Sequence, residues 1–210
     1  MDPAAERHGS EAALAEARAR RVVTLAGHAG DEEAARAGLI EEAGGTRAAA
    51  LGALSRMGRL VQRDLVAALG DPAADVRRRA CELSTRCPEV DLRAPLADPE
   101  PLVVEAAAWA AGERCDRSSV DAVAMVATNH PDPLCREAAV AALGAIGDER
   151  GLPAILAAQS DRPAVRRRAV IALAPFSGPA VDAALARARQ DRDWQVRQAA
   201  EDLLDEPTER

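Results

Sequence analysis

The stretch VRRRA, Val76 to Ala80, returns along the chain in recognisable form. Its copies have an Ala in the fifth place every time and an Arg in the second place in all but one: TRAAA at Thr46, VVEAA at Val103, CREAA at Cys135, VRRRA at Val165 and VRQAA at Val196. Successive copies lie roughly 30 residues apart, a period typical of helical solenoids, in which each repeat is one pair of helices. The repeat therefore predicts an all-α solenoid and argues against a doubly wound sheet or a closed bundle.

The composition agrees with this prediction. The chain has 210 residues, of which 48% are hydrophobic, with one Phe, two Trp and no Tyr. Most of the hydrophobic residues are Ala, Leu and Val, and the first two are strong helix formers that suit thin layers of closely packed helices. The formal net charge of -7 argues against general nucleic-acid binding, because neutralisation of phosphates supplies most of its non-specific affinity.

The sequence contains no apolar run of the roughly 20 residues that a membrane span requires. Its first residues carry acids and no apolar core, unlike a secretory signal, so we expect a cytoplasmic protein with reduced thiols. Cys115, His130 and Cys135 offer metal-ligating atoms, but no paired CxxC accompanies them, and we predict no metal and no cofactor.

The expected organisation is a single structural domain with a capping helix in residues 1–30, helix pairs in residues 31–206 and a disordered tail in residues 207–210. Within the first segment, a helix is predicted over residues 4–27. The outer helices are predicted at 32–43, 59–69, 89–97, 117–128, 149–159 and 178–189. The inner helices, which carry the repeated motif, are predicted at 46–57, 73–86, 100–112, 133–146, 163–174 and 193–204. The third outer helix is the weakest prediction, because Pro95 interrupts it.

The repeated Arg falls on the flank of the predicted core stripe, where one repeat meets the next. A side chain in this place can rest its stem on the neighbouring repeat and direct its head to loop carbonyls or to an Asp, as in the pairs Asp71 with Arg77 and Asp191 with Arg197. The sequence therefore predicts a structural ladder whose members are Arg47, Arg77, Arg136, Arg166, Arg197, Asp71 and Asp191.

Two further positions on each inner helix lie opposite the core stripe. The position one residue after the repeated Arg is polar in most repeats, whereas the position five residues after it reads Trp, Ala and Ile in three consecutive repeats. An apolar strip with a charged rim is typical of a groove that holds an amphipathic helix or an extended segment. The predicted partner-binding residues are Arg78, Glu82, Glu105, Trp109, Glu137, Ala141, Arg167, Ile171 and Gln198. The same strip is also compatible with self-association.

Three longer stretches resemble HEAT repeats of the short bacterial kind also found in phycobilisome-lyase-like proteins: DPAADVRRRACELSTRC from Asp71, DPLCREAAVAALGAIGDERGLPAILAA from Asp132 and DRPAVRRRAVIALA from Asp161. The resemblance covers residues 31–206. It implies a right-handed superhelix whose concave side is lined by the helices carrying the repeated motif, and a role in holding another macromolecule. The departure at Val104, where the pattern has Arg, predicts a local irregularity.

No P-loop, GxSxG, HExxH or GxGxxG motif is present, so no catalytic residues are assigned. We therefore expect a non-catalytic scaffold or adaptor that binds a protein or peptide on its concave face. Two alternatives stay open. One is a HEAT-like DNA-repair glycosylase, for which Trp109, Trp194 and Asp193 are the residues to consider, although the acidic balance argues against it. The other is an accessory subunit of a bilin lyase or related enzyme.

Overall fold

The computed structural model describes residues 3–205, and every regular element in this range is a helix. The predicted all-α solenoid is therefore confirmed. The chain divides into two compact units, Met1–Val90 and Asp91–Arg210. The predicted tail at residues 207–210 lies outside the described residues. None of the described helices combines the length and the apolar character that crossing a membrane requires.

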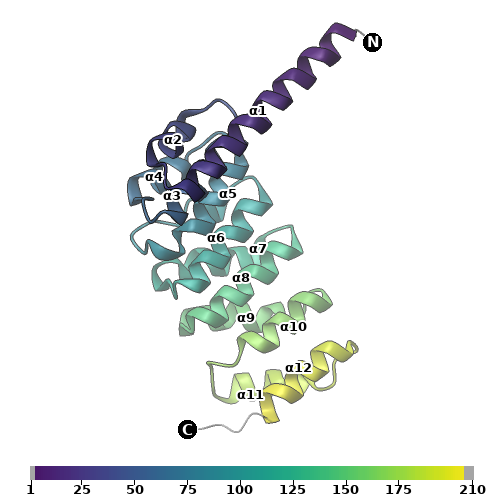
Figure 1. The fold of residues 1–210 in the computed structure, drawn as a ribbon. Coiled ribbons are helices and arrows are strands. Elements are labelled where there is room, and N and C mark those ends of the chain that lie inside the picture. Colours follow the sequence, from purple (N-terminus) through teal and green to yellow (C-terminus); the bar gives the residue numbers. More distant parts are fainter. Residues whose placement is uncertain (1–2, 206–210) are drawn as a thin grey trace. The chain divides into compact units, whose positions relative to one another are not determined.

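The first unit begins with the long helix α1, which packs mainly on α3 (Figure 1). Val23 and Ala26 in its last turns are buried against the rest of the unit. Glu16 and Arg20 lie beside Gly45 at the start of α3, and the N-terminal turns project beyond the other helices of the unit. In the core of this unit, Leu51, Leu65 and Val76 pack together. The helices of the unit are α1 (Pro3–Ala29), α2 (Glu32–Ala37), η1 (Gly38–Ile40), α3 (Gly44–Arg56), α4 (Gln62–Leu69), α5 (Ala74–Leu83) and η2 (Ser84–Arg86).

The second unit contains an inner row of helices, α6, α8, α10 and α12, in which each packs on the next. The helices α7, α9 and α11 pack against this row from the other side (Figure 1). The elements of the unit are η3 (Pro95–Ala97), α6 (Pro101–Glu113), η4 (Arg117–Ser119), α7 (Val120–Asn129), α8 (Pro133–Ile146), η5 (Glu149–Gly151), α9 (Leu152–Ala158), α10 (Pro163–Ala172), α11 (Pro179–Ala188) and α12 (Trp194–Asp205).

The repeated motif fixes which side of each inner helix faces the core. The Ala in the fifth place is completely buried in all six copies, at residues 50, 80, 107, 139, 169 and 200. The residue in the first place, most often Val, is also buried in every copy. Small and β-branched side chains at these places let the backbones of neighbouring helices approach closely.

The starts of the inner helices follow from local chemistry. Asp132 caps α8, because its carboxylate accepts a hydrogen bond from the amide of Leu134 at 2.9 Å. Pro133 follows in the first turn, where its missing N–H costs no hydrogen bond. Pro101 and Pro163 hold the same place in α6 and α10.

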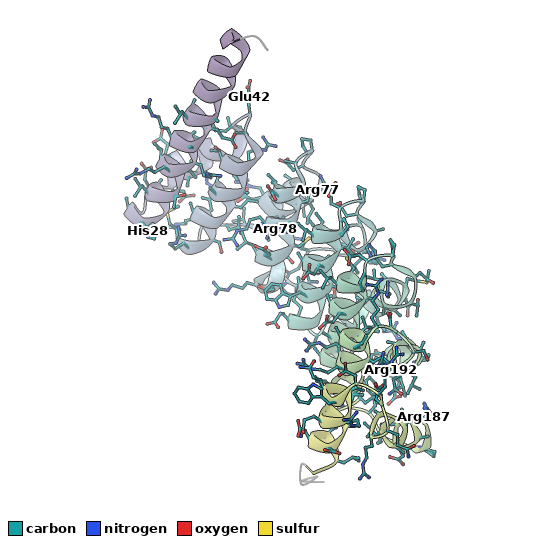
Figure 2. The ribbon with its side chains drawn as sticks, turned by 90° about the vertical axis from the view of Figure 1, so that its right-hand side faces the viewer. His28, Glu42, Arg77, Arg78, Arg187 and Arg192 are labelled. Carbon is teal, nitrogen blue, oxygen red and sulfur yellow. The ribbon has the colours of Figure 1, made fainter. Side chains whose placement is uncertain are left out.

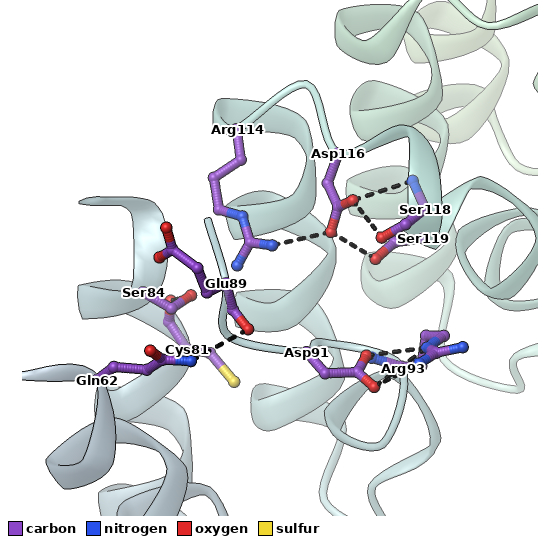
Figure 3. A network of polar contacts seen from close by, with 10 residues as sticks. All are labelled: Gln62, Cys81, Ser84, Glu89, Asp91, Arg93, Arg114, Asp116, Ser118 and Ser119. Carbon is purple, nitrogen blue, oxygen red and sulfur yellow. Dashed lines mark hydrogen bonds and ion pairs between the residues drawn. The ribbon is translucent and has the colours of Figure 1, made fainter. Parts of the chain in front are cut away.

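The predicted outer helix at residues 89–97 is wrong. Only the short 3-10 turn Pro95–Ala97 forms there, because Pro95 cannot donate the hydrogen bond that a continuing helix needs. Polar contacts order this part of the chain in place of a helix (Figure 3). The Asp91 carboxylate accepts hydrogen bonds from the guanidinium of Arg93, the closest at 2.7 Å. The predicted first outer helix is also shorter than expected, since α2 ends at Ala37 and a 3-10 turn follows.

Candidate functional site

Arginines of the repeated motif connect neighbouring repeats through paired hydrogen bonds. In three repeats the guanidinium donates from two nitrogens to the two oxygens of an Asp carboxylate in the next repeat, at 2.6–2.8 Å: Arg47 to Asp71, Arg136 to Asp161 and Arg166 to Asp191. This two-point geometry is the strong form of the Arg–carboxylate interaction. These hydrogen bonds hold the pKa of each of the three carboxyl groups below its ordinary value.

The motif arginines also donate hydrogen bonds to backbone carbonyl oxygens at the start of their own repeat. Arg77 donates to the carbonyl oxygen of Asp71 at 2.8 Å, and Arg197 donates to the carbonyl oxygen of Asp191 at 2.8 Å. The structure thus pairs these Asp carboxylates with the Arg of the preceding repeat, instead of the Arg of the same repeat that the sequence suggested. Asp161 belongs to the same arrangement and was missed.

The arrangement changes where the motif has Val104. Val104 is completely buried. His130 holds the place, relative to the next motif, that Asp71 and Asp191 hold in their repeats. Arg136 still donates to the carbonyl oxygen of His130, at 2.7 Å. At this junction Val104 replaces the Arg and His130 replaces the Asp that would accept its hydrogen bonds. Because both charged residues are replaced together, neither is left buried without the other.

The predicted binding residues of the second unit lie on the exposed side of the inner row. Trp109 on α6 is 46% exposed and Ile171 on α10 is 41% exposed, whereas Ala141 between them is half-buried. Glu105 and Glu137 are half-buried beside them, and Arg167 and Gln198 are exposed. These side chains are thus accessible and stand on four consecutive helices.

The predicted residues of the first unit are engaged with each other. On α5, Glu82 accepts hydrogen bonds from Arg78 at 2.6 Å and from Arg79 at 2.8 Å. Figure 2 shows Arg77 and Arg78 in this unit, and Arg187 and Arg192 close to the end of the chain. Because the two units are separate compact bodies, we treat the inner row of the second unit as the candidate site.

A groove opens between α10 and α12, with a volume of about 480 Å³. Its apolar part includes Ile171 and the 63% exposed Trp194, and its polar part includes Arg167, Gln198 and Asp202. Gln198 donates to the carboxylate of Asp202 at 2.6 Å, so these two side chains hold each other in place. The volume of the groove lies within the range of ligand sites, and its lining combines apolar with polar and charged side chains.

The sizes of two residues explain why this groove is open. Between α8 and α10, a Cβ added to Gly144 would lie 2.7 Å from the Cα of Ala172, so the two backbones touch. The residues in the equivalent motif places are Ala174, in the turn that follows α10, and Leu203 on α12, and both line the groove. Larger side chains at this crossing keep the helices apart.

Three exposed apolar residues of the inner row were not among the predicted partner-binding residues. Leu102 on α6 and Leu134 on α8 are each more than half exposed, one turn before Glu105 and Glu137. Trp194 begins α12 at the place where the other inner helices of this unit begin with Pro. That exchange of Pro for Trp was visible in the sequence and could have indicated the groove.

Of the residues considered for a glycosylase, Asp193 and Trp194 are neighbours in the chain, whereas Trp109 lies apart from them. Asp193 accepts a hydrogen bond from the amide of Gln195 at 2.9 Å, as a helix cap does. Trp109 lies on α6, and α8 and α10 follow it in the inner row before α12, which carries Trp194.

The cysteine and histidine groups each have separate neighbours. The thiol of Cys135 donates to the carbonyl oxygen of Pro101 at 3.2 Å, and burial raises its pKa to about 11, so it stays protonated near neutral pH. Cys115 contacts the carbonyl oxygen of Ala145, and a ring nitrogen of His130 accepts from the amide of Asp132. Among the described residues no group of His, Cys, Asp and Glu has the arrangement of a metal site.

The family comparison matches residues 90–161 to the model described as HEAT repeats. None of the curated proteins matches the sequence. YibA of Escherichia coli has a similar solved structure, with 17% identity and a TM-score of 0.60, covering 82% of this chain and 69% of YibA. A designed armadillo repeat protein gives 16% identity and a TM-score of 0.58, covering 80% of this chain and 96% of its own.

A second designed armadillo repeat protein, solved in complex with the peptide (KR)4, gives 16% identity and a TM-score of 0.57 over 89% of this chain and 97% of its own. At these identities the likeness concerns the fold. The resemblance to HEAT repeats is confirmed, whereas the phycobilisome-lyase-like subtype stays a prediction. The chain is a helical-repeat protein whose residues 90–161 are HEAT repeats.

Proposed function

We propose that this protein is a non-catalytic scaffold that binds a segment of a partner protein in the groove between α10 and α12 of its second unit. The observation that carries the proposal is the open groove between α10 and α12. Exposed Trp and Ile side chains are costly in water and are common anchors of binding interfaces, particularly beside hydrogen-bonding groups that fix a ligand's orientation. The fold supports this function, since a designed armadillo repeat protein of similar structure was solved with a bound peptide.

The chemistry of the groove indicates how such a segment is held. Trp194 and Ile171 offer an apolar contact for one large side chain of the partner. Arg167 provides a fork of donors that suits a carboxylate or a backbone carbonyl of the partner. Because Gln198 is already fixed by Asp202, its carbonyl oxygen is pre-oriented as an acceptor. A large apolar side chain next to an acidic or neutral residue therefore fits the groove.

Selection from a displayed library of random 12-residue peptides, which when extended are longer than the roughly 8–10 Å between two packed helices, tests the proposal. Peptides that bind the wild-type protein should lose at least about tenfold in affinity for Ile171→Asp and for Trp194→Ala, since both changes remove the apolar contact. Arg187→Glu on α11 is the matched surface control and should bind as the wild type does. Selected peptides that bind all four proteins equally would contradict the proposal.

A further inference from the structure

The outward face of α1 carries an apolar stripe with basic residues in it. Leu14, Val22 and Leu25 are each more than half exposed. Arg18 and Arg21 are exposed on the same side, and at 100° per residue all five side chains fall within about 100° of one another. The buried residues of α1 lie on the opposite side of the helix. A surface helix usually turns charged and polar residues to water, so this face has the character of a docking surface.

A complementary surface lies on α6 and α8. We call it the acidic face, and define it by Leu102, Glu105, Trp109, Leu134 and Glu137. Its Leu and Trp side chains are exposed. In the described part of the chain Glu105 has no ion pair, and Glu137 has only a 3.5 Å contact with Arg168. The acidic face thus offers apolar contacts and two carboxylates that form few ion pairs within the described part of the chain.

We infer that the outward face of α1 docks on the acidic face of a second copy of this chain. Arg18 and Arg21 then lie against Glu105 and Glu137, and the apolar residues of α1 contact Leu102, Trp109 and Leu134. This contact lies beside the groove between α10 and α12, so it goes beyond the proposed function and leaves that groove open for a partner.

The dimensions of the two surfaces agree. Leu14 and Val22 are about 12 Å apart along the helix, from a rise of about 1.5 Å per residue. Packed helices such as α6 and α8 stand about 8–10 Å apart. A copy of α1 that crosses both helices can therefore place one apolar side chain over each, with Arg18 between them.

A symmetric pairing of two α1 helices is disfavoured by charge. In an antiparallel pair centred on the stripe, Arg18 of each copy would face Arg21 of the other, because Leu14 would pair with Leu25. Like charges brought together in an interface oppose association. Docking of α1 on the acidic face avoids this repulsion, because the two Arg of α1 then lie against Glu105 and Glu137.

The contact joins two different patches, so association is head-to-tail and can add further copies. A single helix face buries an area at the low end of stable interfaces, and we expect association in the micromolar range. It should weaken in high salt, since exposed charges are screened.

Sedimentation velocity between about 1 and 200 μM tests the inference. The mean mass of the wild-type protein should rise with concentration. Arg18→Glu with Arg21→Glu should remain monomeric, and so should Glu105→Arg with Glu137→Arg. Combining all four substitutions should restore association, because the charges are exchanged and still complementary. Arg187→Glu, a charge reversal on α11, should associate as the wild type does.

A wild-type protein that stays monomeric over this range would overturn the inference. So would association that survives reversal of the acidic face, the result expected if α1 pairs with α1. If circular dichroism shows that a reversed variant is unfolded, Leu14→Ser with Leu25→Ser provides the same test on exposed positions and should abolish association. The peptide selection described above uses different residues, so either proposal can fail while the other stands.

Discussion

The crossing of α8 with α10 and the crossing of α10 with α12 use the same repeated motif but have different outcomes. Both carry an Arg–Asp contact at one end, Arg136 with Asp161 in the first and Arg166 with Asp191 in the second. The first crossing is closed at Gly144, whereas the second leaves a groove of about 480 Å³. The Arg–Asp contact therefore joins neighbouring repeats at both crossings alike, and the size of the crossing residues decides whether a surface is available for binding.

The largest effect on the free energy of unfolding is expected at acidic pH, because protonation of the Asp side chains weakens the Arg–Asp contact that both crossings share. Asp71, Asp161 and Asp191 have pKa values below their ordinary values because each accepts hydrogen bonds from an Arg. A carboxyl group whose pKa is lower in the folded than in the unfolded state stabilises the protein at pH values above its unfolded pKa of about 3.9. This stability is lost as the pH falls through the folded-state pKa.

Urea midpoints measured from pH 7 down to about pH 2.5 should therefore be flat above about pH 5 and fall steeply below about pH 4. The fall should be shallower for Asp161→Asn, which has lost one of the three carboxyl groups. An equally steep fall in that variant would show that other groups cause the acid sensitivity.

Single contacts of the ladder give the next largest effect. Asp161→Ala and Asp191→Ala should each lower the free energy of unfolding by about 3 kcal/mol, because each leaves a largely buried Arg without its carboxylate. Arg166 is only 6% exposed. Similar losses at both crossings, measured by urea unfolding, are expected if the contact is common to them. A large loss at one crossing only would mean that the ladder itself distinguishes the open crossing from the closed one.

The crossing residues give a smaller effect that differs between the two places. Ala172→Leu puts a large side chain where the backbones touch and should cost about 1–3 kcal/mol through overpacking. Ala174→Leu makes the same change at the exposed wall of the groove and should stay within about 0.5 kcal/mol of the wild type. Equal destabilisation of both variants, measured by urea unfolding, would contradict the difference between a closed and an open crossing.

Much of this fold follows from the sequence, for identifiable physical reasons. The buried Ala of each motif was predictable because it recurs at a fixed place in a helix with a known period. The weakness of the outer helix before Pro101 was visible in Pro95, but the contacts that order this segment in place of a helix, such as Asp91 with Arg93, depend on side-chain positions and were not predictable. Likewise, the choice of Asp161 as partner of Arg136 depends on which loop lies nearest in space.

The candidate site was only partly predictable. Trp109 and Ile171 were found because helical periodicity places them opposite the core. The groove itself was missed, since it arises from the crossing of two helices and involves Leu203 on one wall and Trp194 at the start of α12. Comparing crossing residues between repeats, Gly144 with Ala174 and Ala172 with Leu203, would have indicated it.

Quenching of Trp194 fluorescence by acrylamide tests most directly whether this open crossing is the binding surface. The Trp109→Phe variant leaves Trp194 as the only Trp in the chain. Without ligand, Trp194 should be quenched readily, as its 63% exposure requires. Saturation with a library-selected 12-residue peptide should lower the quenching constant by about threefold or more, because the peptide covers the indole ring. A peptide that binds this variant with its full affinity and leaves the quenching constant unchanged would place the binding surface elsewhere and contradict the account.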